Sequence, residues 1–124
     1  MKKHTAFVLL FAVALGAFAQ TKPAPKKEQE YYEIKTLPIP KEIYLEVGGL
    51  ATMPDGRLAV STRRGEIWIV ENPYQKSSHQ TYYRRFASGL HEVLGLAYKD
   101  GAFYCSQRGE LTKITDTDRD GVED

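Results

Sequence analysis

Acidic residues alternate through the last nine positions of the sequence, which read Asp116-Thr117-Asp118-Arg119-Asp120-Gly121-Val122-Glu123-Asp124. Acids at positions 1, 3, 5 and 9 of this run, with glycine at position 6, match the oxygen-rich loop that wraps Ca²⁺. In such a loop the alternate carboxylates converge on one point, and the glycine allows a sharp turn. The pattern predicts a Ca²⁺ site whose ligands are Asp116, Asp118, Asp120, Asp124 and the backbone carbonyl of Val122.

The acidic loop, as we call residues 116–124, also has a simpler interpretation as a solvated acidic turn. A Ca²⁺ loop of this type carries a bidentate acid at its twelfth position. That position lies beyond Asp124, so we expect these 124 residues to bind Ca²⁺ weakly on their own.

Three further residues are weak candidates for chemistry. His91 can act as a base or a ligand at neutral pH, although a lone loop histidine more often has a structural role. Arg63 and Arg108 occupy the same place before a glycine in two similar stretches, where they serve either the fold or an anionic ligand or cofactor. The sequence contains no Ser-His-Asp pattern, no P-loop and no G-x-G-x-x-G, so no complete active site can be assigned.

Those two similar stretches form an internal repeat. The first contains Gly49-Leu50-Ala51, Asp55-Gly56, Ser61, Arg63 and Gly65-Glu66-Ile67, and the second contains Gly95-Leu96-Ala97, Asp100-Gly101, Ser106, Arg108 and Gly109-Glu110-Leu111. The distance in sequence between matching positions falls from 46 residues at the first glycine to 45 at Asp-Gly and 44 at Gly-Glu. A period of about 40–50 residues built from short strands and glycine turns is typical of the blades of a β-propeller.

The repeat predicts where the strands lie. In the first copy we expect strands at residues 50–53, 57–62, 66–71 and 81–88, and in the second at residues 96–99, 102–107 and 110–115. Residues 31–36 also have the composition of a strand. After residue 20, only the short stretch 42–47 is ambiguous between helix and strand.

Several of these strands are apolar on both faces, as a sheet pressed between neighbours would be. Ile67 and Ile69 face one side while Trp68 and Val70 face the other. The predicted fold class is therefore all-β, an incomplete β-propeller of about two four-stranded blades. Because propellers close with about 4–8 blades, we expect the remaining C-terminal blades to belong to the same, longer protein. A self-assembling two-blade protomer is the alternative.

The start of the chain has the features of a secretory signal peptide. Lys2 and Lys3 precede an apolar run, and Ala17-Phe18-Ala19 has the small residues of a cleavage site. The predicted organisation is a signal peptide at residues 1–19, a disordered linker at 20–30 and the propeller part at 31–124. We expect export to the periplasm or the extracellular space, with no membrane span after cleavage.

Charge and cysteine content restrict the partners. Without Lys2 and Lys3 the chain has 15 basic and 16 acidic residues, a net charge of −1, which gives no attraction to nucleic acid. The pairs Arg63-Arg64 and Arg84-Arg85 are interpreted as solvated faces. Cys105 is the only cysteine and lies in an apolar run, so we expect a buried, inert thiol rather than a reactive one.

Residues 44–124 resemble the secreted propellers of the glucose/sorbosone dehydrogenase-like group, in the branch of large multidomain bacterial proteins that often carry a haem c module downstream. The motifs that carry the resemblance are Gly89-Leu90-His91-Glu92, Gly95-Leu96-Ala97, Asp100-Gly101, Gln107-Arg108-Gly109-Glu110-Leu111-Thr112-Lys113-Ile114 and Asp116-Thr117-Asp118-x-Asp120-Gly121. The resemblance implies a six-bladed propeller, bound Ca²⁺, and pyrroloquinoline quinone that oxidises a sugar with a histidine as base. In those enzymes the histidine loop reads Gly-His-Arg-Asn-Pro-x-Gly-Leu. In this chain the histidine, His91, stands one place later in the loop. Only the acidic loop therefore matches the pattern of the family position by position.

Three hypotheses follow from the sequence. The first is the N-terminal part of an exported propeller related to quinone-dependent sugar dehydrogenases, in which the complete protein is an oxidoreductase and this part alone is inactive. The second is a non-catalytic extracellular propeller that binds a small sugar, a glycan or a protein. The third is a truncated product without a stable fold.

Overall fold

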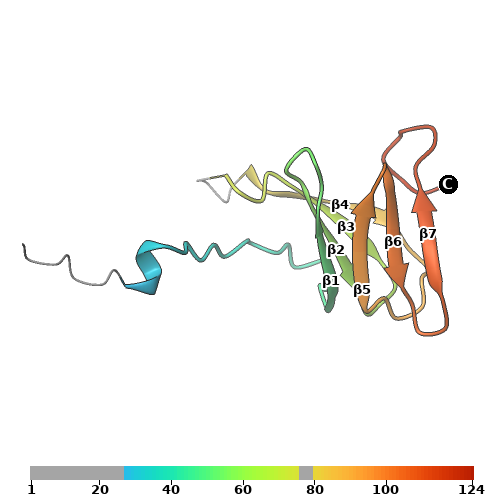
Figure 1. Cartoon of the computed structure of the whole chain (residues 1–124), viewed down its shortest axis with the longest axis horizontal. Helices are drawn as coiled ribbons and strands as arrows, with labels where there is room; N and C mark the ends of the chain where they lie inside the picture. Colours follow the sequence, from blue (N-terminus) through green and yellow to red (C-terminus); the bar gives the residue numbers. More distant parts are fainter. Residues whose placement is uncertain (1–26, 76–79) are drawn as a thin grey trace, which may run out of the picture. The chain divides into compact units, whose positions relative to one another are not determined.

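The computed structural model describes residues 27–75 and 80–124, and in this part of the chain the fold is all-β (Figure 1). The chain divides into two units, Met1–Glu33 and Ile34–Asp124. A single 3-10 turn, η1 (Glu28–Glu30), lies in the first unit. The second unit contains the strands β1 (Val47–Thr52), β2 (Leu58–Thr62), β3 (Ile67–Glu71), β4 (Tyr82–Ala87), β5 (Gly95–Lys99), β6 (Ala102–Ser106) and β7 (Leu111–Thr115).

The seven strands form two antiparallel sheets, and within each sheet every strand pairs with the next along the chain. The first sheet has the order β1-β2-β3-β4 and the second the order β5-β6-β7. Short turns join β2 to β3, β5 to β6 and β6 to β7, and the β5–β6 turn consists of the Asp100-Gly101 pair of the repeat. The predicted strands are confirmed to within one residue at nearly every end, and the second copy of the repeat has three strands among the described residues.

β1 is the exception, because it begins three residues before its predicted start and includes Gly48 and Gly49. A Cβ atom on Gly48 would lie 1.9 Å from the carbonyl oxygen of Val93, and one on Gly49 would lie 2.7 Å from the backbone nitrogen of Leu96. The two glycines therefore let β1 approach the backbone around β5 more closely than any side chain permits.

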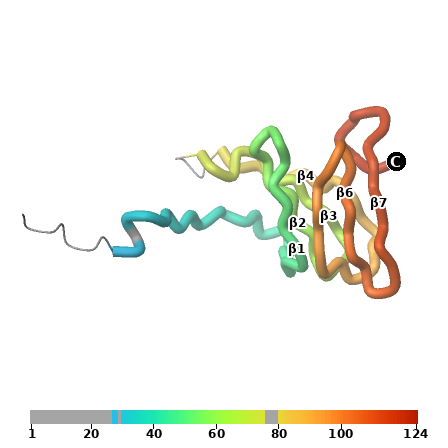
Figure 2. The backbone as a smooth tube through the Cα atoms, viewed as in Figure 1, coloured from blue at the N-terminus to red at the C-terminus, as the bar shows by residue number. Residues whose placement is uncertain are grey.

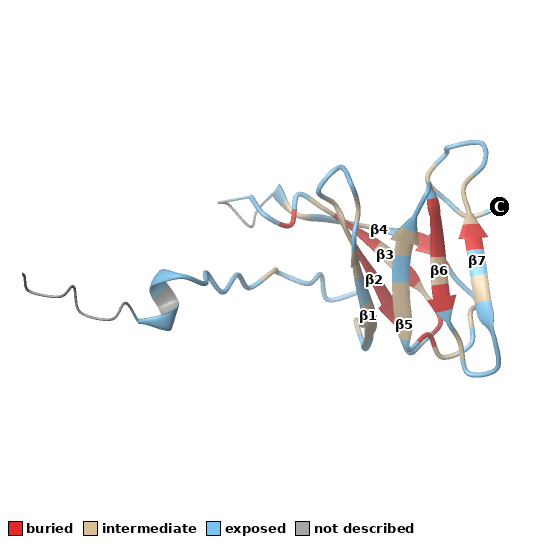
Figure 3. Ribbon diagram, in the orientation of Figure 1, coloured by how far each residue is buried: buried red, intermediate tan, exposed pale blue. Residues whose placement is uncertain are grey.

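The core lies between the two sheets (Figure 3). It joins residues from both, namely Ala59, Ile67, Ile69, Phe86 and Ala87 from the first sheet, Phe103, Cys105 and Ile114 from the second, and Val93 from the connection. The Phe103 ring makes an edge contact with Phe86 at a centroid distance of 5.0 Å and a tilted contact with Tyr98 at 4.8 Å. The contact of Phe103 with Phe86 joins the two sheets face to face, whereas its contact with Tyr98 lies within the second sheet. The prediction of a buried Cys105 is confirmed.

The first sheet is also apolar on the face turned away from this core. Val60 and Val70 are 3% and 1% exposed, yet neither belongs to the core cluster. Because side chains alternate along a strand, both lie on the opposite face with Trp68, which is half-buried, and Leu50, which is 57% exposed. The first sheet thus has apolar side chains on both faces, as predicted, and one of these faces packs against the second sheet.

One prediction for the N-terminal region is wrong. Residues 31–36 form no strand: a turn residue is followed by irregular backbone, and Tyr32 and Ile34 are 70% and 92% exposed. With no neighbouring strand among the described residues, their β-propensity has nothing to pair with. Residues 42–47, which the sequence leaves ambiguous, contain no helix: a turn and irregular backbone lead directly into β1.

Other N-terminal predictions fall largely on undescribed residues. The predicted signal peptide, residues 1–19, lies outside the described residues, and so do residues 20–26 of the predicted linker. Residues 28–30 of that linker form the η1 turn. Among the described residues, no helix has the length and apolar character needed to cross a bilayer.

The turns gather at two opposite ends of the sheets (Figure 2). What we call the loop end has the turns at Gly56 and Gly101 together with the acidic loop that follows β7. What we call the turn end has the β2–β3 turn, the β4–β5 connection and the β6–β7 turn. At the turn end Leu90 N–H donates to the Gly65 carbonyl at 3.0 Å, and Arg108 N–H donates to the His91 carbonyl at 3.1 Å.

Candidate functional site

The acidic loop brings three carboxylates together at the loop end. One oxygen from each of Asp116, Asp118 and Asp120 lies within 4.8 Å of the others. Asp116 is half-buried at the end of β7, and the other two side chains are exposed. Positive φ angles at Arg119 (64°) and Gly121 (92°) turn the backbone so that alternate side chains point inward.

The loop holds each of these carboxylates by one oxygen. The backbone N–H of Gly121 donates to Asp116 Oδ2 at 3.0 Å, that of Asp120 to Asp118 Oδ1 at 3.1 Å, and that of Val122 to Asp120 Oδ1 at 2.8 Å. The second oxygen of each carboxylate is left for another partner. For Asp116 that atom, Oδ1, is buried and accepts no hydrogen bond.

This donor set fits Ca²⁺. The ion takes oxygen ligands at about 2.3–2.6 Å, so two ligands on opposite sides are separated by about 4.6–5.2 Å. The 4.8 Å spread of the three oxygens is within that limit. A buried, unpaired carboxylate oxygen is costly without a cation, and the divalent ion would balance much of the charge of three acids.

The structure does not bring the carboxylate of Asp124, another predicted ligand, into this group. Asp124 instead accepts short hydrogen bonds at Oδ2 from the hydroxyl and the backbone N–H of Thr117. The Thr117 hydroxyl bond, followed by the backbone bond, lowers the pKa of Asp124 below its ordinary value. Val122 donates its N–H to Asp120, and its side chain is 46% exposed.

The end of the acidic loop is fastened to β4 of the other sheet. Arg84 donates a short hydrogen bond from Nη1 to the carbonyl oxygen of Gly121. The Glu123 N–H donates to the Phe86 carbonyl at 3.1 Å, and the Ser88 N–H donates to Glu123 Oε1 at 3.2 Å. The loop thus connects the last strand of the second sheet to the outer strand of the first.

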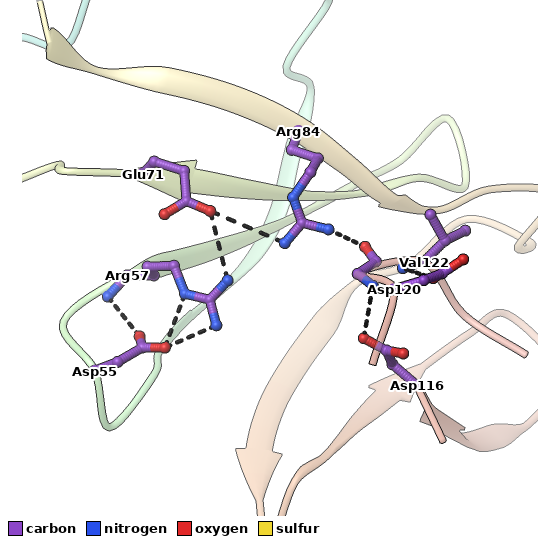
Figure 4. A network of polar contacts seen from close by, with 8 residues as sticks. Asp55, Arg57, Glu71, Arg84, Asp116, Asp120 and Val122 are labelled. Atoms are coloured by element: carbon purple, nitrogen blue, oxygen red, sulfur yellow. Dashed lines mark hydrogen bonds and ion pairs between the residues drawn. The ribbon is translucent and has the colours of Figure 1, made fainter. Parts of the chain in front are cut away.

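An ion-pair network extends from this contact across the loop end (Figure 4). Arg84 lies 3.9 Å from Glu71, and the same Glu71 oxygen lies 3.4 Å from Arg57. Arg57 in turn holds Asp55 at 2.7 Å, and its hydrogen bond lowers the pKa of that carboxyl. From its place in the Arg84-Arg85 pair, Arg84 is expected to lie on a solvated face. It belongs to this ion-pair network instead, which the sequence did not predict. The available signal was Arg57, which replaces the alanine found after Asp-Gly in the second copy.

His91, Arg63 and Arg108 all lie at the turn end, away from the acidic loop. His91 is exposed, and its backbone N–H donates to Gln107 Oε1 at 2.5 Å. Arg108 lies 3.6 Å from Glu92, a non-glycine residue with a φ of 46°. Arg63 has an exposed side chain and donates its N–H to the Glu46 carbonyl at 2.8 Å. Within residues 27–75 and 80–124, no carboxylate is hydrogen-bonded to the His91 ring.

No protein-family model, curated protein or solved structure matches this chain. The geometry of the loop end and the turn end, together with the sequence motifs, is what indicates a function.

Proposed function

We propose that the chain forms two neighbouring blades of an exported β-propeller and that its acidic loop binds Ca²⁺. The observation that carries the metal proposal is that Asp116, Asp118 and Asp120 each place a carboxylate oxygen within 4.8 Å of the others, while Oδ1 of Asp116 is buried and accepts no hydrogen bond. Asp116, Asp118 and Asp120 would hold the ion. Asp124 serves in this proposal to close the loop through Thr117.

The arrangement of the sheets supports the blade proposal. β1 and β5, the first strands of the two sheets, lie against each other. The connection after β4 returns from the opposite edge of the first sheet to β5. Radially stacked blades use such a path, since each blade begins near the axis and ends at the rim. The apolar outer face of the first sheet, with Leu50 and Trp68, suits a further blade of the complete protein.

Titration of the chain with Ca²⁺ by calorimetry tests the metal proposal. We expect a single site in the weak range of about 10⁻⁴–10⁻³ M, because three acids and no bidentate twelfth ligand hold the ion. Asp116→Asn should abolish the binding heat. Asp100→Asn, at a turn of the same end, is the matched control and should bind as the unaltered chain does. A flat titration with the unaltered chain would exclude the site.

We further propose that the complete protein oxidises a sugar with pyrroloquinoline quinone, in an exported location. The support is the run of motifs over residues 44–124, together with the position of His91, Arg63 and Arg108 at one end of both sheets. The quinone would supply the electron acceptor at that end, and His91 is the candidate base. The test is sugar oxidation by the complete protein with quinone, Ca²⁺ and an artificial acceptor. No turnover across a panel of aldoses would reject this proposal.

A non-catalytic binding propeller is the second candidate. It is favoured by the His91 ring, which is exposed and has no carboxylate hydrogen bond among the described residues to orient it as a base. Binding of a glycan or a protein by the complete protein without uptake of a redox cofactor would select this candidate, whereas bound quinone would eliminate it.

A further inference from the structure

A pocket of about 420 Å³ lies between the two sheets at the loop end, next to the acidic loop. Its lining comes from both sheets and the loop, and consists of Met53, Arg57, Ile69, Arg84, Phe86, Tyr98, Gly101, Phe103, Asp116, Arg119, Asp120 and Gly121. Pockets of about 300–1,000 Å³ hold small organic ligands. This one therefore has room for a molecule of the size of a monosaccharide.

The floor of the pocket is apolar and aromatic. Phe86 and Phe103 are buried in the core, and Tyr98 is half-buried beside Phe103 at 4.8 Å between ring centroids. Ligand pockets commonly combine such an apolar wall with a few placed polar groups. The ring carbons of a sugar can pack on a wall of this kind.

The polar rim of the pocket contains three guanidinium groups and two carboxylates. Arg57 and Arg84 are held in place through Glu71, and Arg84 also donates to Gly121. Arg119 forms no ion pair with any residue that the structure describes, and its φ of 64° is unusual for a side chain of this kind. A guanidinium that is not held in an ion pair within the described part of the chain is suited to an anionic group of a ligand.

We propose that this pocket binds a small carboxylated sugar, with the sugar carboxylate on Arg119 and the ring against Tyr98. The planar guanidinium matches a carboxylate with two parallel N–H···O bonds, and these charge-assisted bonds are about twice as strong as neutral ones. The sugar hydroxyls can accept from the remaining N–H groups of Arg57 and Arg84. Neutral sugars lack the group that Arg119 recognises.

This inference rests on the proposed Ca²⁺ site, because Asp116 and Asp120 also line the pocket. Without a cation in the loop, these two carboxylates oppose the entry of an anion. With Ca²⁺ bound, they are balanced and the three arginines dominate the rim. Binding of the acidic sugar should therefore require Ca²⁺.

The test is an NMR titration of the chain with D-glucuronate at saturating Ca²⁺, with D-glucose as the neutral comparison. We expect amide shifts at Gly101, Arg119 and Gly121, and binding of glucose at least about tenfold weaker. Arg119→Gly removes the guanidinium while relaxing the backbone at φ 64°, so the fold is kept, and it should weaken glucuronate about tenfold. Arg64→Gln removes an exposed arginine charge at the turn end and should leave binding unchanged.

The two proposals fail in different ways in this experiment. Shifts in the acidic loop on addition of Ca²⁺, followed by none with glucuronate, would overturn the sugar inference and leave the metal site standing. Equal affinities for glucuronate and glucose, or unchanged binding in Arg119→Gly, would also overturn it. An absence of Ca²⁺ shifts would remove the metal site, and with it the expected Ca²⁺ dependence of sugar binding.

Discussion

Gly65 and Leu90 lie in backbone contact at the turn end, although 25 residues separate them in sequence. The Leu90 N–H donates to the Gly65 carbonyl oxygen at 3.0 Å. A Cβ atom on Gly65 would lie 1.8 Å from the Leu90 carbonyl oxygen. The β2–β3 turn and the β4–β5 connection therefore fit together only because position 65 has no side chain.

Gly65→Ala should be strongly destabilising for this reason. Gly65 has a φ of +83°, so alanine adds backbone strain to the clash with Leu90. We expect a loss of about 2–5 kcal/mol in the free energy of unfolding, measured by urea denaturation. Gly56→Ala is the matched control, because its φ is +87° but nothing lies within 4 Å of the added atom. The control should lose only about 1 kcal/mol, and equal losses would show that the backbone contact is unimportant.

Asp55 should make stability depend on acidic pH. Its hydrogen bond with Arg57 lowers its pKa below the ordinary value of 3.8. A depressed native pKa stabilises the fold above the unfolded pKa, and this contribution is lost as pH falls through the native value. The ion pair is largely solvated, so we expect less than about 1 kcal/mol.

Substitution by asparagine isolates that contribution. The difference in unfolding free energy between the unaltered chain and Asp55→Asn should be largest near neutral pH and should shrink as pH falls below about 4. A difference for Asp55→Asn that does not change with pH would contradict the prediction.

Cys105 should react with thiol reagents only when the fold opens. Its side chain is fully buried between the sheets, and burial, with a smaller contribution from Glu110, raises the pKa of the thiol. The thiolate is the reactive form, so labelling by a disulfide reagent should be slow in buffer and should rise with urea in step with unfolding. Rapid labelling of the native protein would instead show the reactive thiol that the sequence also allowed.

Much of the fold could be predicted from the sequence because local signals and the repeat agreed. Asp-Gly turns mark the β1–β2 and β5–β6 connections, and the second copy confirmed the strand limits of the first. The predicted strand at residues 50–53 leaves out Gly48 and Gly49, a residue type with low β-propensity. Their role depends on the nearness of Val93 and Leu96, which is a contact between sheets and has no local signal.

The candidate site was predicted only in its local part. The spacing of Asp116, Asp118 and Asp120 was sufficient to predict that their carboxylates lie close together, because the loop that contains them is continuous in sequence. The Arg57–Glu71–Arg84 network joins the β1–β2 turn to β3 and β4, and the pocket beside it needs both sheets. Neither can be read from spacing along one segment.

The contact of Arg84 with Gly121 predicts that the acidic loop and β4 are coupled. Ca²⁺ should slow hydrogen exchange at the Glu123 amide, which donates to the Phe86 carbonyl, because an ordered loop keeps this bond closed. Arg84→Gln removes the guanidinium that donates to Gly121 and should reduce this protection about threefold to tenfold. Arg85→Gln is the control, since Arg85 pairs with Glu66 at 3.6 Å and does not line the pocket. If both variants exchange alike, the Arg84 contact does not hold the loop on β4, and the ordering by Ca²⁺ is confined to the loop itself.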